Sequence, residues 1–177
     1  MTLDEAIAGK EIPEDVRKTL ALVEIPYLSF DRQDLRGRLV LHRSLAEEVK
    51  EIFAILRGRS FPIDKMRPIV AYGWDDDASM ADNNTSAFNY RPIAGTARLS
   101  NHAYGCAIDI NPRQNLYERA ADGLVLPPGA RYEPIARGTV IPSVAEVFKS
   151  RGWNWGGDWE SHKDWQHFEK ILPGAGS

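Results

Sequence analysis

The stretch Ser100-Asn-His-Ala-Tyr-Gly-Cys-Ala-Ile-Asp-Ile110 ends in a strict alternation of side chains. Successive residues of a strand point to opposite faces, so Ile108 and Ile110 share one face while Asp109 lies on the other. A strand that buries its isoleucines turns the Asp109 carboxylate away from the apolar face and toward a cleft. We therefore predict a short strand over residues 107–110 that presents a carboxylate on its outer side.

Beyond this stretch, the clearest pattern predicts a helix over residues 44–56. Ser44 stands at the N-cap position and Glu47 at the capping-box position, followed by an apolar stripe of Leu45, Val49, Ile52, Phe53 and Leu56. A second helix is expected from a Ser143 cap to Arg151. Further helix is expected within residues 1–25, and strands are expected over 27–30, 38–42, 69–73, 88–91 and 167–171. Because helices and strands do not alternate regularly, we expect an α+β fold.

The chain is expected to form one domain with a short N-terminal arm. Its 177 residues suit a single domain, and no repeat or linker divides them. We assign residues 1–35 to a helical arm packed on the domain and residues 36–174 to the domain itself. Residues 115–141 are rich in turn-forming residues and predict an irregular insertion.

The composition excludes several classes of protein. A chain that is 43% hydrophobic and 27% charged is typical of soluble globular domains. No apolar run approaches the length of about 18 residues that a membrane span needs. The net charge of -3, without a basic stripe, argues against nucleic-acid binding. The single cysteine excludes an internal disulfide framework, and residues 1–10 lack the features of a signal peptide.

Two separate segments carry groups that could bind one metal ion. His102 and Asp109 lie in the stretch quoted first, and Asp164-Trp-Gln-His167 follows near the C-terminus. Two imidazoles and one carboxylate supply three ligands and leave the fourth position of a tetrahedral zinc ion open, as in catalytic zinc sites. Asp164 is then a spare carboxylate close to the metal, in the place of a general base.

Two other side chains compete for roles in such a site. His162 could pair with His167 as in a zinc finger, but that arrangement needs two cysteines. We therefore expect His162 at a solvated rim. Cys106 could be a nucleophile, although the strand pattern puts it on the buried face of Ile108, where cysteine behaves as a small apolar residue.

Two arginines could stabilise the developing oxyanion of a substrate. Arg91 precedes a proline, and Arg98 lies nearer to His102 in the sequence; spacing alone does not choose between them. The tryptophans near the second ligand could belong to the core or line a cleft for a peptide or sugar. They are Trp153, Trp155, Trp159 and Trp165.

Together these segments resemble the VanY-type zinc D,D-peptidases. The resemblance rests on Ser100-x-His102-x-x-Gly105-x-Ala107-x-Asp109, followed by Asp164-x-x-His167-Phe168. The stretches 83–91 and 153–159 also look like a subgroup with carboxypeptidase-like and endolysin-like members. The resemblance covers residues 38–169, and residues 1–35 carry none of it.

This resemblance implies a fold and a set of roles. The fold would be a small α+β domain with a central antiparallel sheet flanked by helices, as in hedgehog and D,D-peptidase proteins. His102, Asp109 and His167 would bind Zn²⁺, and Asp164 would be the catalytic acid and base. Arg91 matches the arginine that polarises the substrate, which selects it over Arg98. Ser100 is expected beside the substrate, and Trp159 is expected to line its cleft.

The expected activity is hydrolysis of peptidoglycan stem peptides by a zinc-bound water, foremost as a D-alanyl-D-alanine carboxypeptidase. The alternatives are an L-alanyl-D-glutamate endopeptidase, a free dipeptidase, and a non-catalytic zinc-containing binding module as in hedgehog-like relatives. The expected partner is peptidoglycan or a muropeptide, bound by a monomer. The lack of a signal peptide suits release like that of a phage endolysin, a cytoplasmic location, or a trimmed form of an exported enzyme that acts at the cell wall.

Overall fold

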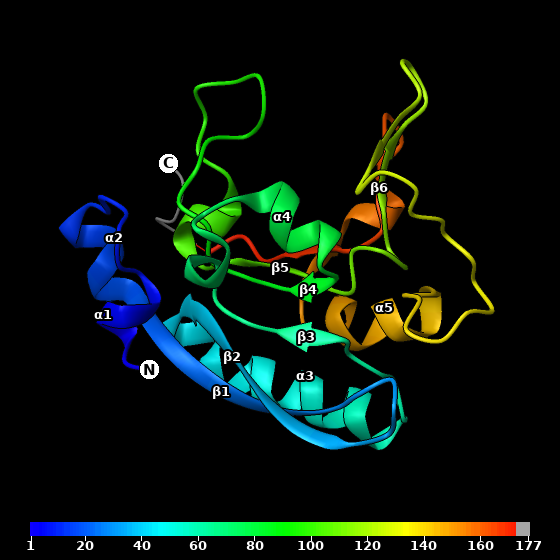
Figure 1. The fold of residues 1–177 in the computed structure, drawn as a ribbon, viewed down its shortest axis with the longest axis horizontal. Helices are drawn as coiled ribbons and strands as arrows, with labels where there is room; N and C mark the ends of the chain where they lie inside the picture. Colours follow the sequence, from blue (N-terminus) through cyan, green and yellow to red (C-terminus); the bar gives the residue numbers. More distant parts are fainter. Residues whose placement is uncertain (173–177) are drawn as a thin grey trace.

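A long β-hairpin braced by a helix forms one side of the computed structural model, which describes residues 1–172 (Figure 1). β1 (Leu20–Leu28) pairs antiparallel with β2 (Asp34–His42) along its whole length. α3 (Ala46–Gly58) packs against β1. The predicted helix is confirmed, and its inward residues Val49, Ile52, Phe53 and Leu56 are fully buried.

The N-terminal residues contain less helix than the sequence predicts. Two short helices, α1 (Leu3–Ala6) and α2 (Glu14–Thr19), lead directly into β1. The expectation of helix up to residue 25 is wrong, because Val23, Ile25 and Tyr27 alternate on the buried face of a strand that β2 pairs with. The predicted boundary between residues 35 and 36 falls inside β2, and residues 173 and 174 of the predicted domain lie outside the described residues.

A three-stranded antiparallel sheet carries the predicted strand around Asp109. Its strand order is β5 (Ala107–Asp109), β10 (His167–Glu169) and β8 (Asn154–Trp155). Ile108 pairs with Phe168, and Phe168 stacks on Phe148 of α5 (Pro142–Lys149) with ring centroids 3.9 Å apart. The next pair in the register is Asp109 opposite His167. The α+β class is confirmed, and the sheet sets two polar side chains side by side on the face away from this core.

The remaining elements are short. β3 (Lys65–Met66) runs parallel to β4 (Asn84–Thr85), and β6 (Tyr117–Arg119) lies between β7 (Leu124–Leu126) and β9 (Lys163–Asp164). The short helices are η1 (Arg43–Leu45), η2 (Ile69–Tyr72), α4 (Asp76–Ala81), η3 (Asn101–Tyr104) and η4 (Gly156–Asp158). Two projections rise on one side of the molecule, the loop of residues 92–99 and the β6–β7 hairpin (Figure 1). Among residues 1–172, no helix has the length and apolar character to cross a membrane.

Several local predictions are wrong for identifiable reasons. The expected strand over residues 69–73 is the helical turn η2, because a short apolar run does not distinguish strand from helix. Residues 88–91 form no strand and bond instead to the segment around His102. The predicted insertion at 115–141 contains the β6–β7 hairpin. Neither predicted serine cap is used, because η1 precedes α3 and because α5 begins at Pro142.

Gly105 closes the turn between η3 and β5, and we expect Gly105→Ala to destabilise the fold. Its φ of 67° is left-handed, and a Cβ there would lie 2.5 Å from the backbone nitrogen of His42. Strained backbone and steric overlap should together lower the free energy of unfolding by about 3 kcal/mol. Denaturant unfolding measures this. Gly58→Ala at the end of α3 is the control, because no atom lies within 4 Å there, and equal loss in both variants would contradict the argument.

Candidate metal centre and its cleft

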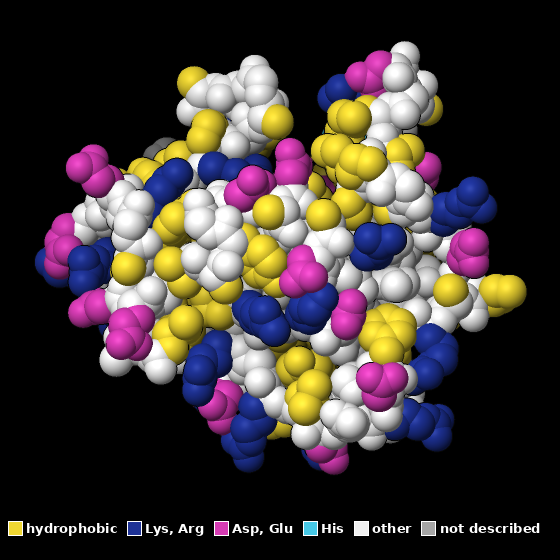
Figure 2. All heavy atoms as spheres, in the orientation of Figure 1, with side chains coloured by type: hydrophobic (Ala, Val, Ile, Leu, Met, Phe, Trp, Pro, Cys, Tyr) yellow, Lys and Arg dark blue, Asp and Glu magenta, His cyan; other side chains and the backbone are white. Residues whose placement is uncertain are grey.

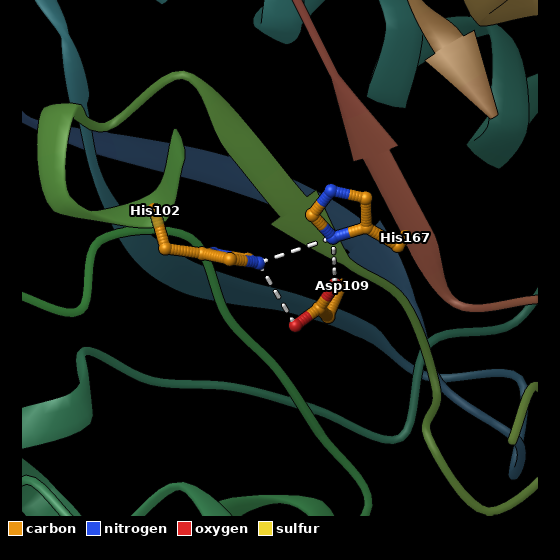
Figure 3. Close-up of side chains that lie close together, drawn as sticks. All are labelled: His102, Asp109 and His167. Carbon is orange, nitrogen blue, oxygen red and sulfur yellow. Dashed lines mark hydrogen bonds and ion pairs between the residues drawn. The ribbon is translucent and has the colours of Figure 1, made fainter. Parts of the chain in front are cut away.

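Three buried side chains from separate elements converge on one point (Figure 3). His102 comes from η3, Asp109 from the end of β5 and His167 from the start of β10. His102 Nε2 lies 3.2 Å from both His167 Nδ1 and Asp109 Oδ2, and His167 Nδ1 lies 2.9 Å from Asp109 Oδ1. None of the three is more than 7% exposed. The structure thus brings together the three residues that the sequence proposed as metal ligands.

These separations are those of ligand atoms around a single metal ion. Atoms bound at about 2.0–2.1 Å to a tetrahedral zinc ion lie about 3.3–3.4 Å from one another. Each of the three residues offers one nitrogen or oxygen, and these atoms lie within 4.8 Å of each other. Their donor set of two imidazoles and one carboxylate suits a divalent transition metal. His102, Asp109 and His167 therefore form a metal-binding site.

Local sequence positions each ligand. The hydroxyl of Ser100 accepts a hydrogen bond from the backbone nitrogen of His102 at 3.3 Å and so caps η3. Gly105 then ends η3 and leads the chain into β5. Asp109 and His167 meet because they are directly opposed in neighbouring strands. The motif from Ser100 to Asp109 is thus a cap, a turn and a strand that aim two ligands at the same place.

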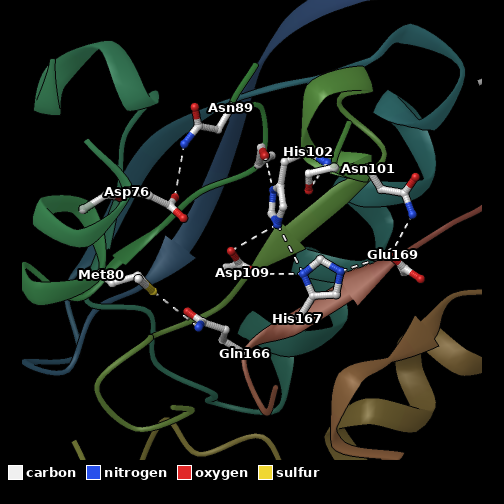
Figure 4. Close-up of polar contacts among 12 residues, drawn as sticks. Asp76, Met80, Asn89, Asn101, His102, Asp109, Gln166, His167 and Glu169 are labelled. Atoms are coloured by element: carbon white, nitrogen blue, oxygen red, sulfur yellow. Dashed lines mark hydrogen bonds and ion pairs between the residues drawn. The ribbon is translucent and has the colours of Figure 1, made fainter. Parts of the chain in front are cut away.

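Outer hydrogen bonds fix which ring nitrogen of each histidine faces the site (Figure 4). His102 Nδ1 donates to the backbone carbonyl of Ala87, which leaves Nε2 free as a ligand. His167 Nε2 donates to Glu169 Oε2 at 3.2 Å, which leaves Nδ1 free. Glu169 also accepts a hydrogen bond of 2.6 Å from the amide of Asn101. Partners of this kind orient metal-bound histidines, and sequence reasoning missed all three of them.

Burial and neighbouring polar groups shift the pKa values of Asp109 and His167 in opposite directions. Burial would raise the pKa of Asp109, but His102 and His167 hold that pKa well below its usual range. Burial would lower the pKa of His167, but its hydrogen bonds to Asp109 and Glu169 raise that pKa to about 10. Without a metal, a proton on the His167 imidazole balances the buried carboxylate. A bound cation takes over that role, because ligands must be deprotonated to bind it.

Glu169→Gln is expected to weaken metal binding. The substitution keeps the shape of the side chain but removes the negative charge that faces His167 Nε2. Loss of such an outer partner typically lowers metal affinity about 10- to 100-fold. Competition with a chromophoric chelator measures the change. Glu51→Gln on the exposed face of α3 is the control, and an unchanged affinity in Glu169→Gln would contradict the role given to this carboxylate.

The metal cluster lines a cleft of about 540 Å³, a volume typical of ligand sites. Ile93 and Arg98 of the loop 92–99 line it, as do Leu124 and Leu126 of the β6–β7 hairpin. Figure 2 shows the two projections standing apart with a hollow between them. The site is therefore both buried at the metal and reachable from outside.

Asp164 of β9 lines the same cleft. Its Oδ1 is buried and has no hydrogen-bond partner within residues 1–172. Burial raises the pKa of Asp164 to about 7, with His167 opposing the rise and Asp109 adding to it. A Cβ on Gly156 would lie 2.8 Å from Asp164 Cβ, so this glycine keeps room for the carboxylate. Asp164 thus places in the wall of the cleft a carboxylate whose pKa lies near neutral pH.

Arg91 also lines the cleft, and an acidic residue that sequence reasoning missed holds it in place. Arg91 Nη2 donates to Asp76 Oδ2 at 2.5 Å. The amide of Asn89 donates to Asp76 Oδ1 at 3.2 Å (Figure 4). Asp76 is the first residue of α4, and the run of aspartates at 75–77 was the only sign of it in the sequence. Arg98, the rival of Arg91, lines the cleft as well.

The other candidate residues have distinct places. Trp159 lines the cleft, with its ring centroid 5.4 Å from that of His167. His162 lines it too, half-buried between the rings of Tyr117 and Trp159, and not at a fully solvated rim as predicted. Cys106 is buried in the core, where burial raises its pKa to about 11, so it does not act as a nucleophile in the cleft.

Comparison with known proteins identifies the class of this site. Residues 94–170 match the family model described as D-alanyl-D-alanine carboxypeptidase, and this segment contains His102, Asp109 and His167. No curated protein and no solved structure gives a significant match. A possible metal site in a cleft, together with this match, indicates a metallopeptidase. Over residues 94–170 the chain is thus similar to the VanY-type peptidases, and this segment contains the two-part motif on which the resemblance rests.

Proposed function

We propose that this protein is a zinc peptidase that releases the terminal D-alanine of peptidoglycan stem peptides. The main support is the geometry of His102, Asp109 and His167, whose ligand atoms lie 2.9–3.2 Å apart in a cleft that also contains Asp164. Three protein ligands leave a tetrahedral zinc ion one open position, as catalysis requires. The family match supports the same class of activity.

In this proposal the protein's own groups move the proton and hold the developing charge. Zinc, when bound, would supply a Lewis acid that acidifies water and polarises the scissile carbonyl. Asp164 accepts the proton of the attacking water and delivers it to the leaving amine. Arg91, anchored by Asp76, donates to the carbonyl oxygen as negative charge develops there. Ser100 and Trp159 line the cleft in which the substrate would lie.

An L-alanyl-D-glutamate endopeptidase is the second candidate. The hollow between the two projections is open (Figure 2), which suits a peptide that continues beyond the scissile bond. A non-catalytic binding module agrees less well with the site. It would have no use for a carboxylate with an unpaired oxygen at Asp164 in the same cleft as an anchored arginine at Arg91.

Mass spectrometry of products from purified muropeptides tests this proposal directly. The zinc-loaded protein should release free D-alanine from stem peptides that end in D-alanyl-D-alanine, and a chelator should stop the release. Release of L-alanine-terminated fragments instead would identify the endopeptidase. Binding to muropeptides without any cleavage would identify the binding module.

A further inference from the structure

Three arginines line the cleft, and they differ in how their charge is neutralised. Arg91 is bound by Asp76 at 2.5 Å. Arg119 is bound by both carboxylate oxygens of Asp122, at 2.9 and 2.6 Å. Arg98 has no acidic partner within residues 1–172, since its hydrogen bonds there involve only its backbone. Arg98 is thus the arginine of the cleft whose guanidinium is free for a ligand.

The backbone of Arg98 is nevertheless held by hydrogen bonds within the loop 92–99. Its carbonyl accepts a hydrogen bond of 2.8 Å from Ile93, and Ser100 donates to the carbonyl of Arg91 at 3.1 Å, so the loop 92–99 forms a small closed hairpin. Arg98 is two residues before Ser100, the cap of η3, and η3 carries the ligand His102. The free guanidinium therefore extends from an anchored point of the chain, four residues before the ligand His102, and lines the same cleft.

The acidic side chains of the cleft influence how an anionic ligand is oriented in it. Glu169 is engaged by Asn101 and His167, and Asp109 by the two imidazoles. Asp77 of α4 and Asp164 of β9 are the acidic side chains of the cleft for which no ion pair is found in residues 1–172. Negative charge on these two side chains repels an anionic group, while Arg98 attracts one. An anionic ligand is therefore favoured with its carboxylate toward the loop 92–99.

Both candidate substrates carry a carboxylate at the same place relative to the scissile bond. In D-alanyl-D-alanine, the residue that supplies the leaving amine bears the terminal carboxylate on its Cα. In an L-alanyl-D-glutamate bond, the D-glutamate bears a free carboxylate on its Cα when the peptide continues through its side chain. One residue of chain spans about 3.5 Å, so this carboxylate stays within the cleft when the scissile amide lies at the metal.

We propose that Arg98 binds the α-carboxylate of the residue that supplies the leaving amine. This inference rests on the proposed peptidase function and names the substrate feature that the same site recognises. An arginine forms paired hydrogen bonds with a carboxylate that a neutral amide does not reproduce. Arg98 would therefore make the enzyme discriminate between peptides with a free carboxylate at this position and peptides with a carboxamide there.

The test compares four peptides with the zinc-loaded protein. Two end in D-alanyl-D-alanine, as the acid and as the C-terminal amide, and two contain the L-alanyl-D-glutamate bond, as the α-carboxylate and as the α-carboxamide. Wild-type protein should prefer the acid of the pair that it cleaves. Arg98→Gln should lower kcat/KM for the acid by about tenfold or more, with little change for the amide. Arg119→Gln, which removes an arginine already paired with Asp122, should keep the wild-type preference.

The outcomes separate this inference from the proposed function. If the wild type and Arg98→Gln cleave with the same preference for the acid over the amide, the role of Arg98 is overturned. The proposed peptidase function still holds in that case. If no peptide is cleaved, the proposed function fails, and calorimetric binding of the same acid and amide peptides then tests Arg98 alone. Weaker binding of the acid in Arg98→Gln, with unchanged binding of the amide, supports the inference in that case, and equal binding overturns it.

Discussion

Asp164→Asn is expected to abolish peptide hydrolysis while the protein still binds its metal. The substitution keeps the shape of the side chain and removes its ability to accept a proton from water. General base catalysis contributes about 10²- to 10⁴-fold to rate, so kcat should fall by a factor in that range. Asp164 is not one of the three clustered ligands, so metal content should stay at the wild-type level. Steady-state kinetics and metal analysis of the same preparation measure both quantities.

A matched variant separates this effect from a general loss of negative charge. Asp158→Asn alters an aspartate of η4 that pairs with Lys149 and does not line the cleft. We expect it to keep the wild-type kcat. Hydrolysis by Asp164→Asn at a near wild-type rate would show that another group takes the proton. Loss of metal from Asp164→Asn would show that this carboxylate belongs to the metal shell.

The metal ligands could be proposed from the sequence because each depends on a short pattern. The cap at Ser100, the turn at Gly105 and the alternation around Ile108 fix the direction of His102 and Asp109 by local geometry. The long-range part, the pairing of Asp109 with His167 across 58 residues, is not local. It could be proposed only because few histidines exist and the two-part motif resembles a known family.

The residues that support the site could not be predicted, because they depend on contacts formed only in the fold. Glu169 looks like any strand carboxylate until β10 places it against Asn101 of η3. The carbonyl of Ala87 has no side-chain signature at all. Asp76 lies 15 residues from Arg91 and meets it only when α4 packs beside the cleft. The strand at 20–25 was missed for a similar reason, since β2 supplies its hydrogen bonds.

Removing the metal is expected to have two effects at once: it should abolish hydrolysis, and it should destabilise the folded protein. A ligand at 1,000 times its Kd stabilises the state that binds it by about 4 kcal/mol. For a chain of this size, each kcal/mol shifts Tm by about 2–4 °C, so chelation should lower Tm by about 8–16 °C. Calorimetry with and without chelator measures the shift, and muropeptide cleavage in the same samples measures activity.

Asp109→Ala shows whether this stabilisation acts through the proposed cluster. The variant removes the carboxylate that both imidazoles contact, so zinc should no longer raise Tm and cleavage should be lost. Asp122→Ala, which removes a carboxylate that pairs with Arg119 on the β6–β7 hairpin, away from the three ligands, should keep the zinc-dependent shift. A full shift in Asp109→Ala would mean that the metal binds elsewhere. If zinc stabilises the wild type but muropeptides stay intact, the cluster is a structural metal site, and the open cleft above it then serves binding alone.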